Sequence, residues 1–127
     1  MCDFCGKPLI HGKKYCSIAC QQNLLHKQKV EKWLSGELEI SVSRSSSKTI
    51  ARYLRDTFGE KCSLCGWDKV NPVTGRVPVE VDHIDGNANN NSPSNVRLLC
   101  PNCHSLTPTY RGLNRGKGRQ GRYTLPL

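Results

Sequence analysis

Hydrophobic residues recur at different spacings along the chain, and these spacings predict two helices. Residues 18–34 carry apolar side chains that fall moderately well on one helical face, and Gly36 follows where such a helix would end. Residues 47–58 have a clearer pattern, because apolar side chains recur every four residues and basic side chains occupy other faces. The sequence therefore predicts a helix over 18–34 and an amphipathic helix with a basic side over 47–58.

The spacing changes to alternation in the second half of the chain, which predicts two strands. Apolar and other residues alternate over 77–82, and Pro78 places this strand at a sheet edge or near the strand's own start. A polar loop over 85–94 separates it from a second extended run over 96–99, and a short helix is expected after Cys100. The predicted order is strand, loop, strand and helix.

A serine-rich stretch divides the chain and indicates a flexible connection. We predict four segments: an N-terminal finger with four cysteines and a helix (1–35), a serine-rich linker (36–46), a small α+β domain (47–110) and a basic, glycine-rich tail (111–127). The tail has too few apolar residues to pack and is expected to contact phosphate or to remain disordered.

Composition limits the class of protein. The chain has 127 residues, too few for a large apolar core, and 19 Lys and Arg against 10 Asp and Glu give a net charge of +9. That charge favours a polyanionic partner such as nucleic acid. The sequence shows neither a signal-peptide pattern at its start nor a long apolar run. We therefore expect a cytoplasmic protein with reduced thiols and no membrane partner.

Eight cysteines fall into four close pairs, a spacing typical of tetrahedral zinc sites. Four disulfides in a secreted protein are the alternative, and the iron site of rubredoxins, which would make the chain an electron carrier, is another. His11 is a competing ligand in the first set. We predict two structural Zn²⁺ sites, one formed by Cys2, Cys5, Cys16 and Cys20 and the other by Cys62, Cys65, Cys100 and Cys103.

Between the second pair of cysteine knuckles lies the run EVDHIDG, residues 80–86, followed by NVRLLCPNCH, residues 95–104. The order C-x-x-C, D-H-I, an asparagine before a strand and C-x-x-C-H resembles the HNH endonuclease family over residues 62–104. The resemblance implies a ββα-metal (HNH) nuclease domain, preceded here by a small four-cysteine zinc finger and helix.

The resemblance also implies a role for each matching residue. His83 matches the general base that takes a proton from the attacking water, and Asp82 and His104 match the ligands of one catalytic divalent ion, Mg²⁺ or Mn²⁺. Asn95 matches the asparagine that braces the hairpin loop. Asp85 is a rival metal ligand, and the rival bracing residues are Asn87, Asn89, Asn90 and Asn91.

Two features of this assignment depend on local geometry. Adjacent strand residues point to opposite faces, so Asp82 and His83 can both face a phosphate only if the strand ends or bulges there. Pro108 should end the helix that carries His104 early, and we consider an extended phosphate-binding segment over 107–111 in place of a longer helix.

We therefore expect a DNA endonuclease of phage or mobile-element type, acting on double-stranded DNA in the cytoplasm of a bacterial host cell. The alternative is a zinc-dependent DNA-binding protein that does not cut. Cleavage of both strands would need a homodimer, two separate nicks or a partner such as a phage packaging protein. The residues expected to contact DNA are Arg52, Arg55, Arg111, Arg115, Lys117 and Arg119.

Overall fold

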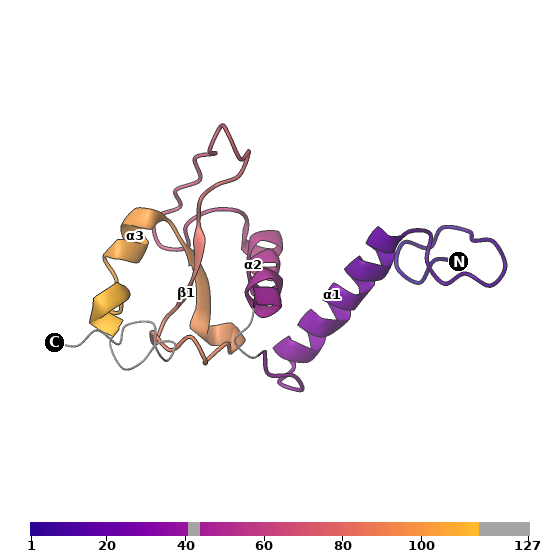
Figure 1. Ribbon diagram of the computed structural model, residues 1–127, viewed down its shortest axis with the longest axis horizontal. Helices are drawn as coiled ribbons and strands as arrows, with labels where there is room; N and C mark the ends of the chain where they lie inside the picture. Colours follow the sequence, from indigo (N-terminus) through magenta and orange to yellow (C-terminus); the bar gives the residue numbers. More distant parts are fainter. Residues whose placement is uncertain (41–43, 115–127) are drawn as a thin grey trace. The chain divides into compact units, whose positions relative to one another are not determined.

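A computed structural model describes residues 1–40 and 44–114 of the chain (Figure 1). The chain divides into two compact units, Met1–Leu38 and the part that begins at Glu39, and each is described by itself. The elements follow in the order α1, α2, β1, a 3-10 turn, β2, α3 and a second 3-10 turn. This is a small α+β architecture with a two-stranded sheet.

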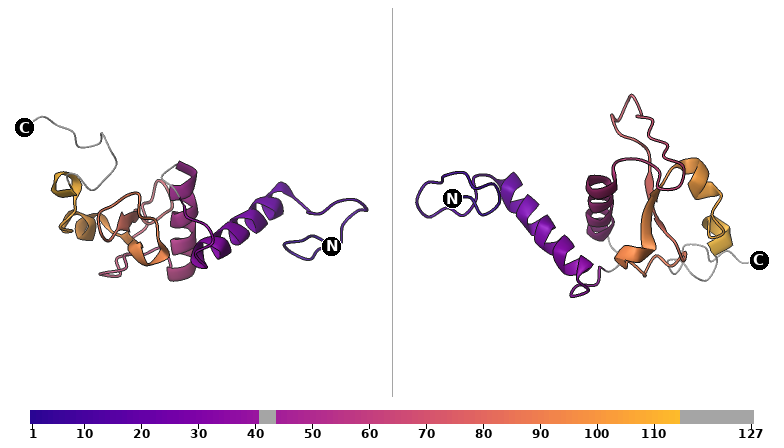
Figure 2. Two further views of the ribbon diagram at one scale, coloured as in Figure 1. Left: turned by 90° about the horizontal axis from the view of Figure 1, so that it is seen from below. Right: turned by 180° about the vertical axis from the view of Figure 1, so that it is seen from behind.

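The first unit holds one long helix, α1 (Ile18–Leu34), which confirms the predicted span. Ser17 caps it, because its hydroxyl accepts a hydrogen bond from the Cys20 amide at 3.2 Å. The helix ends at Leu34 with Ser35 as its C-cap, and Gly36 takes the left-handed φ of +83° that glycine adopts without strain. Two further views show α1 as one uninterrupted helix (Figure 2).

The second unit is built on two antiparallel strands, β1 (Glu80–His83) and β2 (Val96–Leu99), paired so that Asp82 lies opposite Arg97. Helix α2 (Arg44–Phe58) and the short helix α3 (Pro101–Ser105) both pack against this pair (Figure 2). The buried apolar side chains of this unit include Ile50, Leu54, Val77, Val79, Val96, Leu98 and Leu99. The sheet therefore packs on a small apolar core, as expected for a chain with too few residues for a large one.

Strand β1 is shorter than the alternation of the sequence suggests. Val77 and Val79 are buried as expected, but the strand begins only at Glu80. Pro78 has no amide hydrogen to donate to a ladder, and the Val79 amide donates to the Val77 carbonyl at 2.8 Å instead of to another strand. The second predicted strand and the short helix after Cys100 are confirmed at Val96–Leu99 and Pro101–Ser105.

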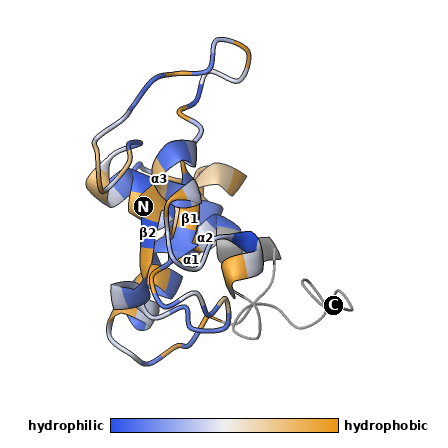
Figure 3. Cartoon of the chain, turned by 90° about the vertical axis from the view of Figure 1, so that its left-hand side faces the viewer, coloured by the Kyte–Doolittle hydropathy of each residue, from blue (hydrophilic) through white to orange (hydrophobic). Residues whose placement is uncertain are grey.

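Helix α2 begins at Arg44, three residues before the predicted start and inside the predicted linker. Apolar periodicity detects only the part from Ile50 onward, because the residues before it are polar and carry no periodic signal. Figure 3 shows both hydrophilic and hydrophobic segments along α2. Ile50 and Leu54 are buried, whereas Phe58 is 61% exposed and contacts the edge of Tyr53.

Leu99→Ala is expected to lower the free energy of unfolding by about 2–5 kcal/mol, because truncating a buried leucine loses apolar burial and leaves a cavity. Leu99 is 0% exposed and directly precedes Cys100. Chemical denaturation of the zinc-loaded protein measures the change. Val73→Ala is the control, since Val73 is 91% exposed, and an equal effect of both substitutions would contradict the prediction.

Among the described residues, no helix is both long enough and apolar enough to pass through a bilayer.

Candidate functional site

The cysteines of the second unit converge on one point. The four sulfur atoms of Cys62, Cys65, Cys100 and Cys103 all lie within 4.8 Å of one another. The first knuckle turns at Gly66, whose amide donates to the Cys62 carbonyl at 2.9 Å and whose φ is +77°. Cys100 caps α3, because its sulfur accepts a hydrogen bond from the Cys103 amide. Four sulfurs at this separation can complete a tetrahedral metal site.

The thiols of this cluster have strongly different pKa values. Burial raises the pKa of Cys62, but backbone amides of Cys100, Cys65 and Leu64 donate to its sulfur, and the net result is a pKa lowered to about 6. Hydrogen bonding to the Cys65 sulfur raises the pKa of Cys103 to about 12. The protein therefore stabilises the thiolate of Cys62 and disfavours deprotonation of Cys103. A bound cation would instead favour the thiolate form of every cysteine in the cluster.

The first unit contains a second cluster of the same kind. The sulfurs of Cys2, Cys5, Cys16 and Cys20 also lie within 4.8 Å of one another, and His11 does not belong to this group. The Cys5 amide lowers the pKa of Cys2 to about 6, and hydrogen bonding to the Cys16 sulfur raises that of Cys20 to about 12. Both sets of cysteines that the sequence predicts as metal ligands are thus brought together.

Asp82 is a buried carboxylate held by two basic partners. The residue is only 5% exposed, and its Oδ2 accepts a hydrogen bond from Arg97 Nε at 3.0 Å. The pairing of the two strands places Arg97 directly opposite Asp82. The other oxygen, Oδ1, lies 3.8 Å from His104 Nε2. The structure therefore brings together the two residues predicted to bind a catalytic ion.

His104 is oriented by groups on both sides of its ring. It lies on α3 next to Cys103, and its Nδ1 is 3.3 Å from a carboxylate oxygen of Glu80. The edge of the ring contacts Tyr110, with the ring centres 5.4 Å apart. Because Glu80 engages Nδ1, the remaining nitrogen, Nε2, faces Asp82.

His83 is the last residue of β1, so the strand ends where the sequence analysis requires an end or a bulge. A turn follows, in which the Gly86 amide donates to the His83 carbonyl at 2.8 Å and Gly86 has a φ of +76°. The half-buried His83 ring makes a short contact of 2.7 Å between Nε2 and Asn91 Oδ1.

The loop after His83 is closed by Asn95, the residue predicted to brace it. Its side-chain amide donates to Asp85 Oδ1 and to the Asn90 carbonyl, both at 2.8 Å, and its Oδ1 accepts from the Asp85 amide. Asp85 also accepts from the Asn90 side chain and the Asn87 amide, each at 2.8 Å. Asp85 is thus engaged in the loop, which argues against its rival assignment as a metal ligand.

Asn90→Ala is expected to raise the pKa of Asp85, because the Asn90 side-chain amide is the largest cause of its lowered value. A lowered pKa adds stability above the ordinary value of about 3.9, and this stability is lost as pH falls through the lowered pKa. Carbon-13 NMR titration of the Asp85 carboxyl measures the shift. Asn89→Ala is the control, since the Asn89 side chain is exposed, and equal pKa values in both variants would contradict the prediction.

The residues predicted to contact DNA have different surroundings. Arg52 is paired with Asp56 at 3.5 Å on the surface of α2, whereas Arg55 turns inward and donates to the Val79 carbonyl at 3.1 Å. Arg55 is therefore committed to holding α2 against the segment before β1, which periodicity alone does not reveal. Arg115, Lys117 and Arg119 lie outside the described residues.

The segment after α3 is folded into turns and not extended, which corrects the alternative considered for residues 107–111. The side chain of Thr107 is buried and donates to the His104 carbonyl at 3.0 Å. Arg111 has a φ of +46°, and its guanidinium lies 5.0 Å from the centre of the Tyr110 ring. Helix α3 ends at Ser105, as the nearby proline predicts, and turns follow because side chains close back on it.

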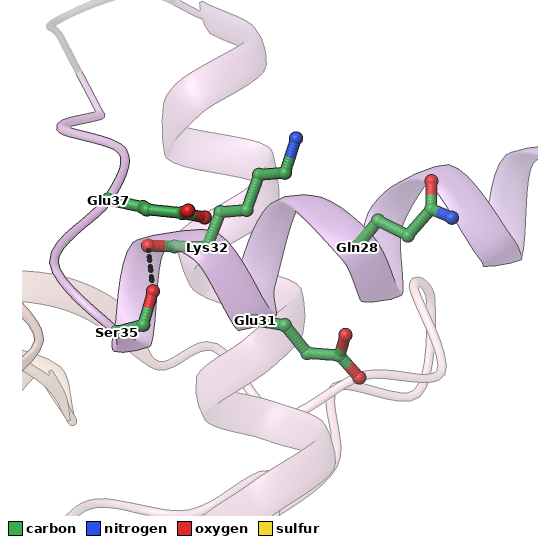
Figure 4. A pocket seen from close by; sticks show the side chains of 5 residues that line it. All are labelled: Gln28, Glu31, Lys32, Ser35 and Glu37. Atoms are coloured by element: carbon green, nitrogen blue, oxygen red, sulfur yellow. Dashed lines mark hydrogen bonds between the residues drawn. The ribbon is translucent and has the colours of Figure 1, made fainter.

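A pocket on the first unit lies far along the chain from these residues. It is lined by Gln28, Glu31, Lys32, Ser35 and Glu37, and the Ser35 hydroxyl donates to the Lys32 carbonyl at 2.9 Å (Figure 4). The side chains of Glu31 and Lys32 extend away from each other, so their polar groups do not converge on one point.

From the sequence, Glu80 and Arg97 had no role at the site, Asn91 was only a rival bracing residue, and Tyr110 was included only in the segment considered over 107–111. Glu80 and Arg97 did carry a signal, because they are charged residues on two short strands. Asn91 had no distinguishing signal among four nearby asparagines. Tyr110 comes near His104 only because the chain turns after α3.

Comparison with known proteins adds two findings. Residues 72–105 match the HNH endonuclease family. Over 78 residues, 61% of the chain, the sequence is 42% identical to the H-N-H endonuclease F-TflIV of Escherichia phage T5, and the match covers 32% of that protein. The chain thus spans about a third of the length of this relative. No solved structure is significantly similar to the chain.

Proposed function

We propose that this protein hydrolyses phosphodiester bonds in DNA, because residues 72–105 match the HNH endonuclease family. The observation that best supports the proposal is the approach of Asp82 Oδ1 to His104 Nε2 at 3.8 Å, next to a histidine at the end of the same strand. The net charge of +9 is consistent with a polyanionic substrate. The relative from phage T5 favours a phage or mobile-element origin. We further propose that the substrate is double-stranded DNA in the cytoplasm of a bacterial host.

Asp82 and His104 would hold one divalent ion, Mg²⁺ or Mn²⁺. Their donor atoms lie 3.8 Å apart, close enough for both to contact one ion, and the bond from Arg97 to the other Asp82 oxygen leaves Oδ1 available. Two protein ligands leave positions for water and phosphate oxygens, as a catalytic site requires. When bound, such an ion stabilises negative charge that develops on the phosphate and on the leaving oxygen.

His83 would act as the general base. A neutral imidazole can accept a proton from water. Asn91 bonds to this ring, and the turn at Gly86 holds the backbone carbonyl of His83. Glu80 and Arg97 would be positioning residues, since Glu80 contacts His104 at Nδ1 and Arg97 contacts Asp82 at Oδ2, which leaves Nε2 and Oδ1 to hold the ion.

We propose that both cysteine clusters hold Zn²⁺ and that the second completes a ββα-metal domain. Strand β1, strand β2 and helix α3 follow in that order, and the cluster joins the start of α3 to the segment at Cys62 and Cys65. Since His104 directly follows Cys103, zinc would orient a catalytic ligand without taking part in the reaction. For the first cluster we propose a structural role.

The test is nicking of supercoiled plasmid by the full chain with and without added Mg²⁺ or Mn²⁺, compared with His104→Ala at equal zinc content. We expect ion-dependent nicking by the native protein and loss of nicking in the variant. Lys69→Ala, an exposed substitution in another loop, is the control for handling and contamination. DNA binding without nicking under every ion would overturn the proposal in favour of a zinc-dependent DNA-binding protein.

A further inference from the structure

The side chain of Asn91 is fixed by groups far apart in the sequence. Its Nδ2 donates to the Ile40 carbonyl at 3.0 Å and to the Ala88 carbonyl at 3.2 Å. Carbonyl oxygens only accept hydrogen bonds, so both hydrogens of the amide are used and the amide cannot be turned over. Asn91 is buried, which makes loss of these bonds costly. The Oδ1 atom is therefore held toward His83.

This fixed orientation determines which nitrogen of His83 carries the proton. The distance from His83 Nε2 to Asn91 Oδ1 is 2.7 Å, and an amide oxygen can only accept. The hydrogen of a neutral His83 ring must then lie on Nε2. A neutral imidazole has one protonated nitrogen, so Nδ1 carries the lone pair, and no hydrogen bond among the described residues engages it.

We propose that Asn91 is the positioning residue for His83: it holds the ring in the Nε2–H form and so makes Nδ1 the atom that accepts a proton. The role of Nδ1 as the base rests on the proposed nuclease function, whereas the proton position does not. Asn95, in contrast, bonds to Asp85 and Asn90 and acts on the loop backbone. Asn95 therefore fixes the loop backbone, whereas Asn91 fixes the His83 ring.

The first measurement uses the unmodified, zinc-loaded protein without DNA or Mg²⁺. Nitrogen-15 NMR of labelled histidine, followed with rising pH until the ring signals no longer change, reports which nitrogen of the neutral ring is protonated. We expect His83 to be in the Nε2–H form alone, with a slowly exchanging Hε2 that shows a nuclear Overhauser effect to Asn91. A ring protonated on Nδ1 would overturn the proposal without any variant.

The second measurement compares Asn91→Ala with Asn89→Ala. Asn89 is a matched control, because its exposed side chain lies in the same loop and only its backbone amide is bonded there. We expect Asn91→Ala to give a mixture of both ring forms and a nicking rate about 10- to 100-fold lower, the range for losing a group that orients a functional histidine. A single Nε2–H form retained in Asn91→Ala would overturn the proposal.

A third variant covers the case in which Asn91→Ala does not fold. Asn91→Asp keeps an oxygen acceptor for the ring and is expected to retain the Nε2–H form, and loss of that form would count against the proposal. Failure of the proposed nuclease function would look different. The native protein would then show no nicking with any ion, while the NMR spectra still decide whether Asn91 sets the proton position.

Discussion

His83→Ala is expected to lower the rate of plasmid nicking by about 10²–10⁴-fold, the loss typical of removing a general base. The ring lies at the end of β1, where the chain turns, and no other histidine of this unit apart from His104 is present to replace it. His104 cannot take over, because its two nitrogens already face Glu80 and Asp82. The rate should recover partly when free imidazole is added, since a small base can then reach the vacated space.

The control for this experiment is His11→Ala, a histidine substitution in the first unit that leaves the described cysteine groups intact. Zinc content and DNA affinity are measured for all three proteins, so that a loss of rate is assigned to chemistry. Equal rates in the native protein and in His83→Ala would mean that another group is the base. If His104→Ala also nicks plasmid at the native rate, the activity comes from a contaminating nuclease.

Removing the metal from the second cluster is expected to unfold the unit that begins at Glu39. Few buried apolar residues support this unit, and the cluster joins α3 to the knuckle at Cys62 and Cys65. Structural zinc binds small domains with apparent free energies of about 10–16 kcal/mol, comparable to the whole stability of such a domain. A strong zinc chelator should therefore abolish the slowly exchanging amides of β2, as followed by NMR.

Two matched substitutions separate the two clusters. Cys65→Ser should cause the same loss of β2 amides without a chelator, whereas Cys5→Ser should leave these amides in place, because its cluster lies in the first unit. Elemental analysis is expected to give two zinc ions per native chain and one in Cys5→Ser. Iron in place of zinc would favour the rubredoxin-like reading, and an unchanged β2 after zinc removal would contradict the structural role.

The local elements followed from the sequence because short-range patterns specify them. The span of α1, the course of β2 and the early end of α3 each depend on residues within a few positions, such as the Ser17 cap, the apolar run and Pro108. The two sets of cysteines were also predicted correctly as groups that meet, since paired knuckles leave few other arrangements. The start of α2 was missed because its first residues carry no apolar period.

The partners of the site residues were decided only by the tertiary structure. Ile40 and Asn91 are 51 positions apart, and no local pattern states that one holds the other toward His83. The inward turn of Arg55 onto Val79 and the bond of Arg97 to Asp82 likewise depend on how α2 and the strands pack. The catalytic roles of Asp82, His83 and His104 stay predictions. The sequence by itself determined which chemical groups are available and in what order, whereas packing between distant segments decided which nitrogen or oxygen of each is engaged by a neighbour.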